Sequence, residues 1–327
     1  MTPTLTPTPT VTPALPVPAA LVVDAHGTGS TSNLNGVLEP GETVIVEPAW
    51  HNGTGLTLTF TGAASNIGGP AGPSYGIADA VADYASAVPG ATTDCYDATP
   101  GHDCYAMTVS GARPVPHWDA TFDETLSLGG SPKTWVLHVG ESFTDVPVGD
   151  MFYRYVEDIF HNGITGGCGA GVYCPTSSVT RAQMAAFLLK AEHGAGYVPP
   201  TCTGIFADVP CPSLFADWIE ELYSEGITGG CGTSPLTYCP SNAVTRAQMA
   251  AFLLKAQHGP AYVPPGCTGI FSDVPCPSLF ANWIEQLYAE GITGGCGAGI
   301  YCPNNPNTRG QMAVFLTKTF GLLLYGP

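Results

Sequence analysis

Two patterns of apolar and polar residues divide the chain near residue 140. Before that point, short segments such as Leu56-Thr-Leu-Thr-Phe60 alternate apolar and polar residues, and clusters of Gly, Pro, Asn and Asp separate them. Alternation of this kind is typical of half-buried strands. After that point, apolar residues recur every three to four positions, which is typical of amphipathic helices. The sequence therefore predicts a multidomain protein with an N-terminal all-β domain and a C-terminal, mainly α region.

The β domain is predicted to cover residues 20–140 as a sandwich of short strands. Besides the alternating segment above, the predicted strands are 20–24, 43–46, 105–109 and 134–139. Residues 76–87 are predicted to form a short helix or a loop. The segment from Asn33 to Glu42 resembles an opening seen in Ig-like modules of secreted bacterial proteins, and this resemblance implies an Ig-like sandwich.

Five oxygen-bearing side chains gather around this opening: Asp24, Asn33, Asn35, Glu39 and Glu42. Carboxylate and amide oxygens are the ligands that calcium prefers, so these residues are a candidate calcium site. The alternative is a plain turn into the strand that begins at Thr43. The spacing of the five residues does not fit the EF-hand pattern.

The α region contains one block three times. Each block opens with Phe-x-Asp-Val-Pro, at Phe143, Phe206 and Phe271, so the period is 63 and then 65 residues. A Gly-Ile-Thr-Gly-Gly-Cys turn begins 20 positions after each Phe, and a Thr-Arg-Ala-Gln or Thr-Arg-Gly-Gln motif follows. A repeat of this size is a supersecondary unit that must pack on its siblings to bury its apolar face.

Each block predicts two helices. In the first helix of the second block, apolar residues at i, i+3, i+4, i+7 and i+8 form one face: Phe215, Trp218, Ile219, Leu222 and Tyr223. A glycine is predicted to end each first helix in a left-handed conformation, with the next Ile folding back as in a Schellman motif. These glycines are Gly163, Gly226 and Gly291. The second helix is predicted to begin with a capping box between its Thr and its Gln.

These motifs, in this order and repeated three times, resemble S-layer homology (SLH) repeats. The resemblance covers roughly residues 141–325 and implies repeats at 141–200, 201–265 and 266–327. It implies a three-lobed helical module that docks on cell-envelope polysaccharide, and a place on the surface of a bacterial cell. The family's helix start usually ends in Glu, whereas here it ends in Gln183, Gln248 and Gln311.

Twelve cysteines fall into six local pairs along the sequence: Cys95–Cys104, Cys168–Cys174, Cys202–Cys211, Cys231–Cys239, Cys267–Cys276 and Cys296–Cys302. The first repeat tests this pairing, because Val139 and Val148 stand where Cys202 and Cys211 stand in the second, so both members are absent together. Six disulfides predict an oxidising, extracellular location. Zinc is the rival interpretation, but the chain has no Cys-x-x-Cys pair with matching histidines.

Composition excludes several classes of partner. The net charge is −17 with nine Lys plus Arg, so nucleic acid and anionic membrane surfaces are unfavourable partners. No apolar run reaches the ~18 residues that a membrane span needs.

Residues 1–19 are rich in Thr and Pro and are expected to be an extended tail or linker, with O-glycosylation as one further role. No basic segment followed by an apolar run opens the chain, so we expect a processed form or a fragment.

Six of the nine basic residues recur at two equivalent positions: Arg181, Arg246 and Arg309, and Lys190, Lys255 and Lys318. A cation in the first helical turn is opposed by the helix dipole, so the arginine needs an anionic partner. That partner is either the motif aspartate (Asp145, Asp208 or Asp273) or a carboxylate on a ligand. In SLH proteins the matching arginine is a principal contact to acidic wall polysaccharide. The lysines are expected to be solvated charges that complement the dipole.

Further candidate glycan- or partner-binding positions are the turn glycines Gly166, Gly229 and Gly294, whose backbone N–H groups could bind sugar oxygens. Trp218 and Trp283 could stack on a sugar ring, although their helical spacing also suits core residues.

No motif of an enzyme is present, and none of the scattered histidines belongs to a recognisable catalytic arrangement. We expect a non-catalytic cell-surface protein, without an assured cofactor, whose SLH repeats anchor it to envelope polysaccharide. The alternative is a structural subunit that binds copies of itself in an extracellular filament or surface layer. A third hypothesis is an accessory domain of a secreted hydrolase.

Overall fold

The computed structural model describes residues 15–27 and 31–327. The chain forms two compact units, one ending at Gly140 with Tyr325–Pro327 added to it, and the other spanning Glu141–Leu324. Most of the predicted Thr/Pro-rich tail lies outside the described residues.

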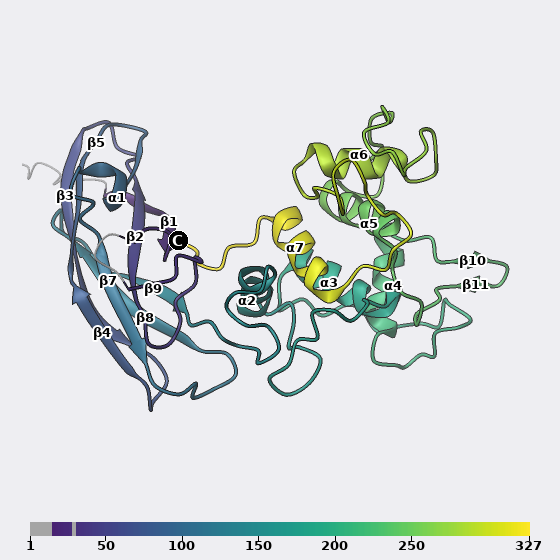
Figure 1. Ribbon diagram of the computed structural model, residues 1–327, viewed down its shortest axis with the longest axis horizontal. Coiled ribbons are helices and arrows are strands. Elements are labelled where there is room, and N and C mark those ends of the chain that lie inside the picture. The colour runs from purple at the N-terminus through teal and green to yellow at the C-terminus, as the bar shows by residue number, and fades with distance from the viewer. Residues whose placement is uncertain (1–14, 28–30) are drawn as a thin grey trace, which may run out of the picture. The chain divides into compact units, whose positions relative to one another are not determined.

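The first unit is built on two antiparallel sheets (Figure 1). One sheet has the order β1 (Val17–Val23), β2 (Thr43–His51), β7 (Tyr105–Ser110) and β4 (Ser74–Asp79), and β6 (Thr92–Asp94) also pairs with β2. The other has the order β5 (Val81–Ala87), β3 (Leu58–Gly68), β8 (Asp119–Leu126) and β9 (Lys133–His138). A single turn of helix, α1 (Cys95–Ala98), follows β6. The five strands predicted from the pattern correspond to β1, β2, β3, β7 and β9.

Residues 76–87 form strands, so the prediction of a helix or loop there was wrong. They belong to β4, which pairs with β7, and to β5, which pairs with β3. In β5 the side chains of Ala82, Tyr84 and Ala87 are buried at nearly alternate positions. Pairing on the sheet and burial of Tyr84 therefore outweigh the helix propensity of the alanines.

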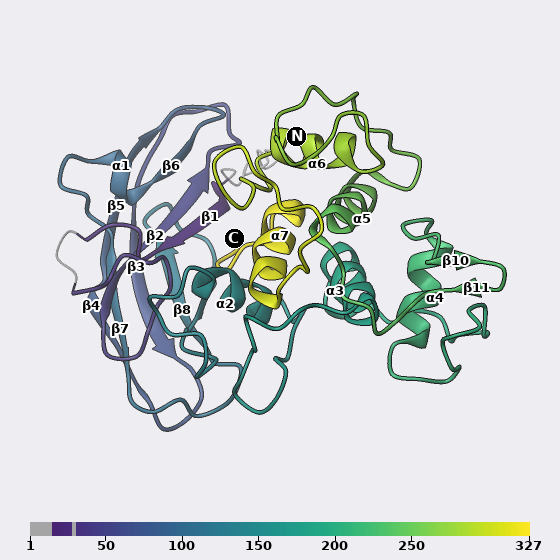
Figure 2. The ribbon, with the colours of Figure 1, turned by 45° about the vertical axis from the view of Figure 1, so that its right-hand side comes forward.

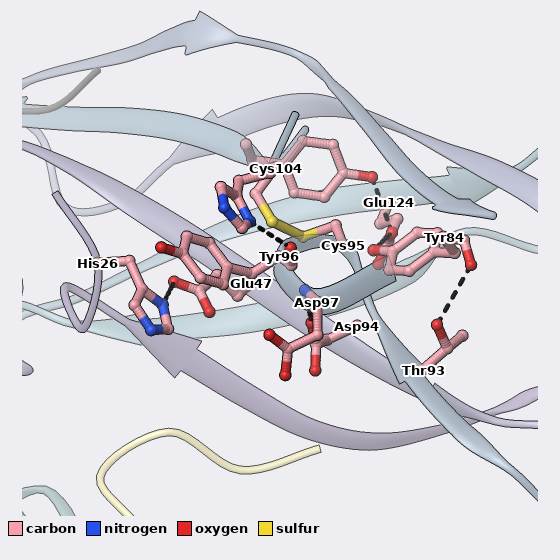
Figure 3. Close-up of a disulfide and its surroundings, with 12 residues drawn as sticks. His26, Glu47, Tyr84, Thr93, Asp94, Cys95, Tyr96, Asp97, Cys104 and Glu124 are labelled. Carbon is pink, nitrogen blue, oxygen red and sulfur yellow. Dashed lines mark hydrogen bonds and ion pairs between the residues drawn. A yellow bond between two sulfur atoms is a disulfide. The ribbon is translucent and has the colours of Figure 1, made fainter. Parts of the chain in front are cut away.

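A buried carboxylate lies inside the first unit. Glu124 on β8 is 1 % exposed and accepts hydrogen bonds from the hydroxyls of Tyr84 and Tyr105 and from the indole N–H of Trp135. Burial raises the pKa of Glu124, although these three donors favour its charged form. Figure 3 shows the bond from Tyr84 beside the Cys95–Cys104 disulfide. The arrangement fixes strands of both sheets around one polar group.

On the other side of that disulfide, His26 lies on the ring of Tyr96 with centroids 3.6 Å apart (Figure 3). The Nδ1 atom of His26 is 2.8 Å from the Oε1 atom of Glu47, which is otherwise buried in β2. These contacts hold the segment that follows β1 against the α1 turn.

The second unit contains six helices within the part of the chain that the structure describes. The first helices of the three repeats are α2 (Tyr153–His161), α4 (Ala216–Ser224) and α6 (Ala281–Ala289). The second helices are α3 (Arg181–His193), α5 (Arg246–His258) and α7 (Arg309–Phe320). The longer turn of the second repeat holds the small hairpin of β10 (Gly232–Thr233) and β11 (Leu236–Thr237).

The second helices form the centre of this unit. α3, α5 and α7 contact one another, and each also contacts the first helix of the next repeat in cyclic order, namely α4, α6 and α2 (Figure 2). The backbone just before these helices closes a ring of hydrogen bonds. Val179 N–H donates to Asn307, Asn307 N–H to Val244 and Val244 N–H to Val179, at 2.8–3.0 Å. The three repeats therefore surround one axis, and the third packs against the first.

The predicted helix boundaries are confirmed. Each second helix begins with a full capping box, as between Thr180 and Gln183. After α2, the N–H of Gly163 bonds to the carbonyl of Phe160 and that of Ile164 to the carbonyl of Ile159, which is the Schellman pattern. Gly163, Gly226 and Gly291 all have positive φ, between 69° and 73°. The Gln of the repeat motif thus has a local structural role.

The six predicted disulfides are all present. No helix in the described residues is both long enough and apolar enough to cross a membrane.

Candidate functional site

The repeated arginines join each repeat to the next. Nε of Arg181 in repeat 1 donates to the carbonyl of Tyr238 in repeat 2 at 2.7 Å, and the Tyr238 hydroxyl donates back to the Arg181 carbonyl at 2.8 Å. Arg246 and Tyr301 make the same exchange between repeats 2 and 3 at 2.9 Å. The Nε group of each of these arginines therefore binds the neighbouring repeat and not its own.

The guanidinium groups are buried between aromatic rings. Arg181, Arg246 and Arg309 are 4–5 % exposed. The Cζ atom of Arg181 lies 4.6 Å from the ring centroid of Tyr238 and 5.5 Å from that of Phe252, and the other two arginines have equivalent pairs of rings. Burial lowers the pKa of each arginine, while the nearby Tyr and Asp raise it. Arginine tolerates such sites because its charge is delocalised and weakly hydrated.

The aspartates of the Phe-x-Asp-Val-Pro motif do not pair with the arginines as one sequence interpretation expected. Asp208 instead accepts the backbone N–H groups of Tyr238 and Cys239, both at 2.7 Å. Asp145 and Asp273 bind the equivalent peptides. The aspartate thus fixes the peptide whose carbonyl receives the arginine, because it holds the N–H side of the same turn.

Each arginine borders a surface groove to which all three repeats contribute. One repeat supplies the arginine, the next supplies its Ile-Thr-Gly-Gly turn and its second helix, and the remaining repeat supplies a half-buried Phe. We name them groove A with Arg181, groove B with Arg246 and groove C with Arg309. The turns are 227–230 in groove A, 292–295 in groove B and 164–167 in groove C. The half-buried phenylalanine is Phe280 in groove A, Phe152 in groove B and Phe215 in groove C.

The repeated lysines also line the grooves. Lys255 lies in groove A, Lys318 in groove B and Lys190 in groove C. Nζ of Lys255 is 3.3 Å from the carbonyl of Gly226, and Nζ of Lys318 is 3.2 Å from that of Gly291. The lysines lie in the last turn of their helices, as the sequence predicted, and Lys318 is exposed. Each also lines the groove of an arginine from another repeat, which the sequence did not predict. Two positive charges therefore border every groove.

The three grooves differ in size and in the state of the guanidinium. Groove B has a volume of about 380 Å³, against about 180 Å³ for groove A and about 210 Å³ for groove C. Nη2 of Arg181 and of Arg309 has a threonine hydroxyl at 3.5 Å. Nη2 of Arg246 is buried and has no hydrogen-bond partner among residues 15–27 and 31–327. The guanidinium beside groove B therefore keeps one buried donor without a hydrogen-bond partner in the described residues.

The turn glycines have two distinct roles. A side chain at Gly166, Gly229 or Gly294, which are exposed and line the grooves, would enter open space. The following glycines have φ between 83° and 89°, and a Cβ there would overlap a backbone carbonyl of the same turn. The second glycine is thus required by the fold, whereas the first leaves room beside the arginine.

Trp218 and Trp283 do not line any of the three grooves. Both are half-buried on the first helices, edge-on to Tyr197 and Tyr262, with ring centroids 6.3 and 6.2 Å apart. Phe215, which does border a groove, was assigned from the sequence only to the apolar face of the first helix, because its neighbour in another repeat is not visible in the sequence.

The candidate calcium residues do come together in the first unit. Asp24, Glu39 and Glu42 are buried, and both Asn33 and Asn35 donate side-chain hydrogen bonds to Glu39 at 2.8 and 2.7 Å. The backbone N–H of Glu39 donates to Glu42 at 2.7 Å. Burial is the main reason why the pKa of Glu42 is raised to about 8, and the charges of Glu39 and Asp24 raise it further. The hydrogen bond from the Glu39 N–H acts in the opposite direction and lowers this pKa.

Comparison with known proteins finds one family match in the second unit and several partial relatives. The S-layer homology domain matches residues 142–185. An endoglucanase of Bacillus sp. (strain KSM-635) is 30 % identical over 122 residues, which is 36 % of this chain and 12 % of the endoglucanase. Exoglucanase XynX of Acetivibrio thermocellus is 26 % identical over 61 % of this chain and 18 % of its own length. S-layer protein EA1 of Bacillus anthracis is 26 % identical over 56 % of this chain and 20 % of its own length. The chain thus spans a fifth or less of these relatives.

Proposed function

We propose that residues 141–324 form an anchoring module of three SLH repeats that binds acidic polysaccharide of a bacterial cell envelope and holds the β unit, an Ig-like sandwich, at the cell surface. The S-layer homology match in repeat 1 supports this, and repeats 2 and 3 carry the same motifs in the same order. The protein acts outside the cell, where its disulfides are stable.

The observation that carries the proposal is the pairing of a buried arginine with a lysine in each groove. The chain has a net charge of −17, yet six of its nine basic residues border these three grooves. A planar guanidinium suits a carboxylate, and the adjoining turn adds backbone N–H groups for sugar oxygens. The ligand that fits best is a sugar bearing a carboxylate.

Groove B is the principal binding site in this proposal. A carboxylate there would satisfy Nη2 of Arg246, which has no partner among the described residues, and the groove has about twice the volume of groove A. In grooves A and C the ligand would have to compete with a threonine hydroxyl for the same atom.

The chain itself is proposed to be non-catalytic. The relatives are named as endoglucanase, exoglucanase, amylopullulanase and S-layer protein, and each is matched over only a small part of its length. A segment shared by proteins of such different names does not depend on one catalytic activity.

The test is co-sedimentation of the full oxidised chain with purified envelopes from a bacterium that carries acidic wall polysaccharide. Three variants accompany the parent: Arg246→Ala, Lys318→Met, which keeps the apolar stem, and Arg154→Ala. Arg154 is exposed and lines none of the three grooves, so its variant removes one charge elsewhere and is the matched control.

We expect binding by the parent and the control, and at least a tenfold loss in Lys318→Met with unchanged circular dichroism. Arg246→Ala should also lose binding, but Arg246 joins repeats 2 and 3, so its unfolding midpoint is measured beside its binding. Loss in the control as well would mean non-specific charge attraction. No binding by the parent would refute the anchoring role.

A second candidate function is a structural subunit of a surface layer or filament, because two of the relatives are named as S-layer proteins. It predicts that the pure protein assembles without polysaccharide. Sedimentation of the parent in the absence of envelopes distinguishes this function from anchoring.

A further inference from the structure

Three buried carboxylates in the first unit have no cationic partner. Asp24 at the end of β1 is completely buried, and Glu39 and Glu42 in the segment before β2 are 4 % and 9 % exposed. Within the described part of the chain, none of the three forms an ion pair with Lys, Arg or His. Burying charged groups without a partner is strongly unfavourable, so such a cluster either holds a proton or binds a cation.

The two oxygens of Asp24 differ in their surroundings. Oδ2 accepts hydrogen bonds from the backbone N–H groups of Asn35 at 2.8 Å and Gly36 at 3.3 Å. Oδ1 is equally buried and has no partner among residues 15–27 and 31–327. A buried oxygen without a partner costs the full desolvation of that atom. The carboxylate is therefore held against the 33–36 loop with one oxygen available for a ligand.

The loop has the spacing of a calcium-binding loop. Asn33-x-Asn35-Gly36 followed by five residues and Glu42 matches positions 3, 5, 6 and 12 of the pattern, with Glu39 at position 9. Only position 1, normally Asp, departs, because it is Thr31. Gly36 has φ +81°, as the sharp turn at position 6 requires. The five residues taken together do not fit the pattern because Asp24 lies on another strand, but the other four do.

Asp24 approaches this loop from the end of β1. It bonds to the N–H groups of Asn35 and Gly36, which are positions 5 and 6 of the loop. The side-chain oxygens of Asn33 and Asn35 are turned back along the loop, where they accept the N–H groups of Asn35 at 3.0 Å and Val37 at 2.8 Å. Asp24, Glu39 and Glu42 and the two asparagines thus belong to one hydrogen-bonded cluster between the end of β1 and the loop.

We propose that Asp24 and the loop from Asn33 to Glu42 bind one calcium ion, with Asp24 supplying the first ligand from the end of β1. The donors are all oxygen, which excludes the softer zinc and copper as preferred ions, and a loop of this length suits the larger calcium better than magnesium. The ion would link the end of β1 to the segment that leads into β2.

The experiment uses the full chain after removal of metal with EDTA. Calcium is titrated calorimetrically, and thermal unfolding is followed with and without about 10 mM CaCl2, well above the ~0.1–1 mM dissociation constants of extracellular calcium modules. Glu42→Gln removes the position-12 carboxylate. Glu47→Gln is the matched control, because Glu47 is also a buried glutamate of this unit but bonds to His26 outside the loop.

We expect one calcium per chain and a rise of a few degrees in the unfolding midpoint of parent and control. Glu42→Gln should keep its fold in EDTA, lose the calcium-induced rise and bind at least tenfold more weakly. Absence of both heat and stabilisation in the parent, equal binding of magnesium, or a Glu42→Gln variant that binds like the parent would overturn the proposal. If Glu42→Gln does not fold, Asn33→Ala replaces it with the same expected loss.

Discussion

Arg309 and Tyr173 are 136 positions apart and exchange two hydrogen bonds. Nε of Arg309 donates to the Tyr173 carbonyl at 2.7 Å, and the Tyr173 hydroxyl donates to the Arg309 carbonyl at 2.8 Å. The same exchange joins repeat 1 to repeat 2 and repeat 2 to repeat 3. This third pair therefore closes the repeats into a ring, which a linear array of repeats would leave open.

Tyr173→Phe should destabilise the second unit by about 1 kcal/mol, because it removes one hydrogen bond and leaves the buried Arg309 carbonyl with one partner fewer. Tyr238→Phe, which breaks the equivalent bond between repeats 1 and 2, is the matched variant. Denaturant unfolding should give similar losses for both. A loss confined to Tyr238→Phe would show that the ring is open in solution.

The two glycines of one turn should respond differently to a side chain. Gly294→Ala is expected to change stability by no more than about 0.5 kcal/mol, because its Cβ enters open space. Gly295→Ala should cost about 1–3 kcal/mol, since φ is +87° and the Cβ would overlap the Ile300 carbonyl. Thermal unfolding measures both.

The larger Gly294→Val tests groove B without disturbing the fold. It should weaken envelope binding at least tenfold in the co-sedimentation assay, while the equivalent Gly229→Val in groove A has a smaller effect. Equal losses in the two variants would contradict the assignment of groove B as the principal site.

Gly310 allows the ring of Phe152 to lie close against α7. Repeats 1 and 2 have Ala182 and Ala247 at this position, and a Cβ on Gly310 would overlap the ring of Phe152, which borders groove B. Gly310→Ala should therefore displace this ring and weaken binding to envelopes severalfold. Because alanine also favours the helix by up to about 1 kcal/mol, stability should change little. A variant that unfolds or binds like the parent would refute this role.

Glu42 should make the metal-free protein less stable as pH rises. Its pKa is raised from 4.5 to about 8 in the folded state by burial and by the charges of Glu39 and Asp24. A raised pKa means that the folded state holds a proton which the unfolded state releases, so the stabilisation is complete below about pH 4.5 and is lost on the way to about pH 8. The unfolding midpoint of Glu42→Gln, relative to the parent in EDTA, should therefore increase across this interval.

Calcium should weaken that pH dependence, because the ion neutralises the same carboxylates. With calcium present the parent should lose less stability between pH 4.5 and 8 than it does in EDTA. An identical pH dependence for parent and Glu42→Gln in EDTA would show that Glu42 is not the titrating group.

Interactions within a few positions of the chain could be predicted from the sequence. The disulfides, the Thr–Gln capping boxes and the glycine at the end of each first helix each depend on residues close together. The motif order that resembles SLH repeats is likewise a property of the sequence. The structure contains these local features because short loops and helix ends offer few alternative partners.

The conformation of residues 76–87 was decided by distant strands. Alanine-rich segments are compatible with a helix, and only pairing with β3 and β7 makes these residues extended. The proposed calcium site also depends on distant residues. Asp24 joins the Asn33–Glu42 segment from the end of another strand, so it cannot be included in a linear spacing rule.

The order of residues along the chain shows which of them are repeated, but it does not show which of them meet in the folded protein. Arg246 and Lys255 are nine positions apart, so they lie on opposite sides of one helix at 3.6 residues per turn. The groove of Arg246 instead holds Lys318 from the next repeat and Phe152 from the first. A helix fixes the direction of its own side chains, but the partner that each side chain reaches depends on the cyclic packing of α3, α5 and α7.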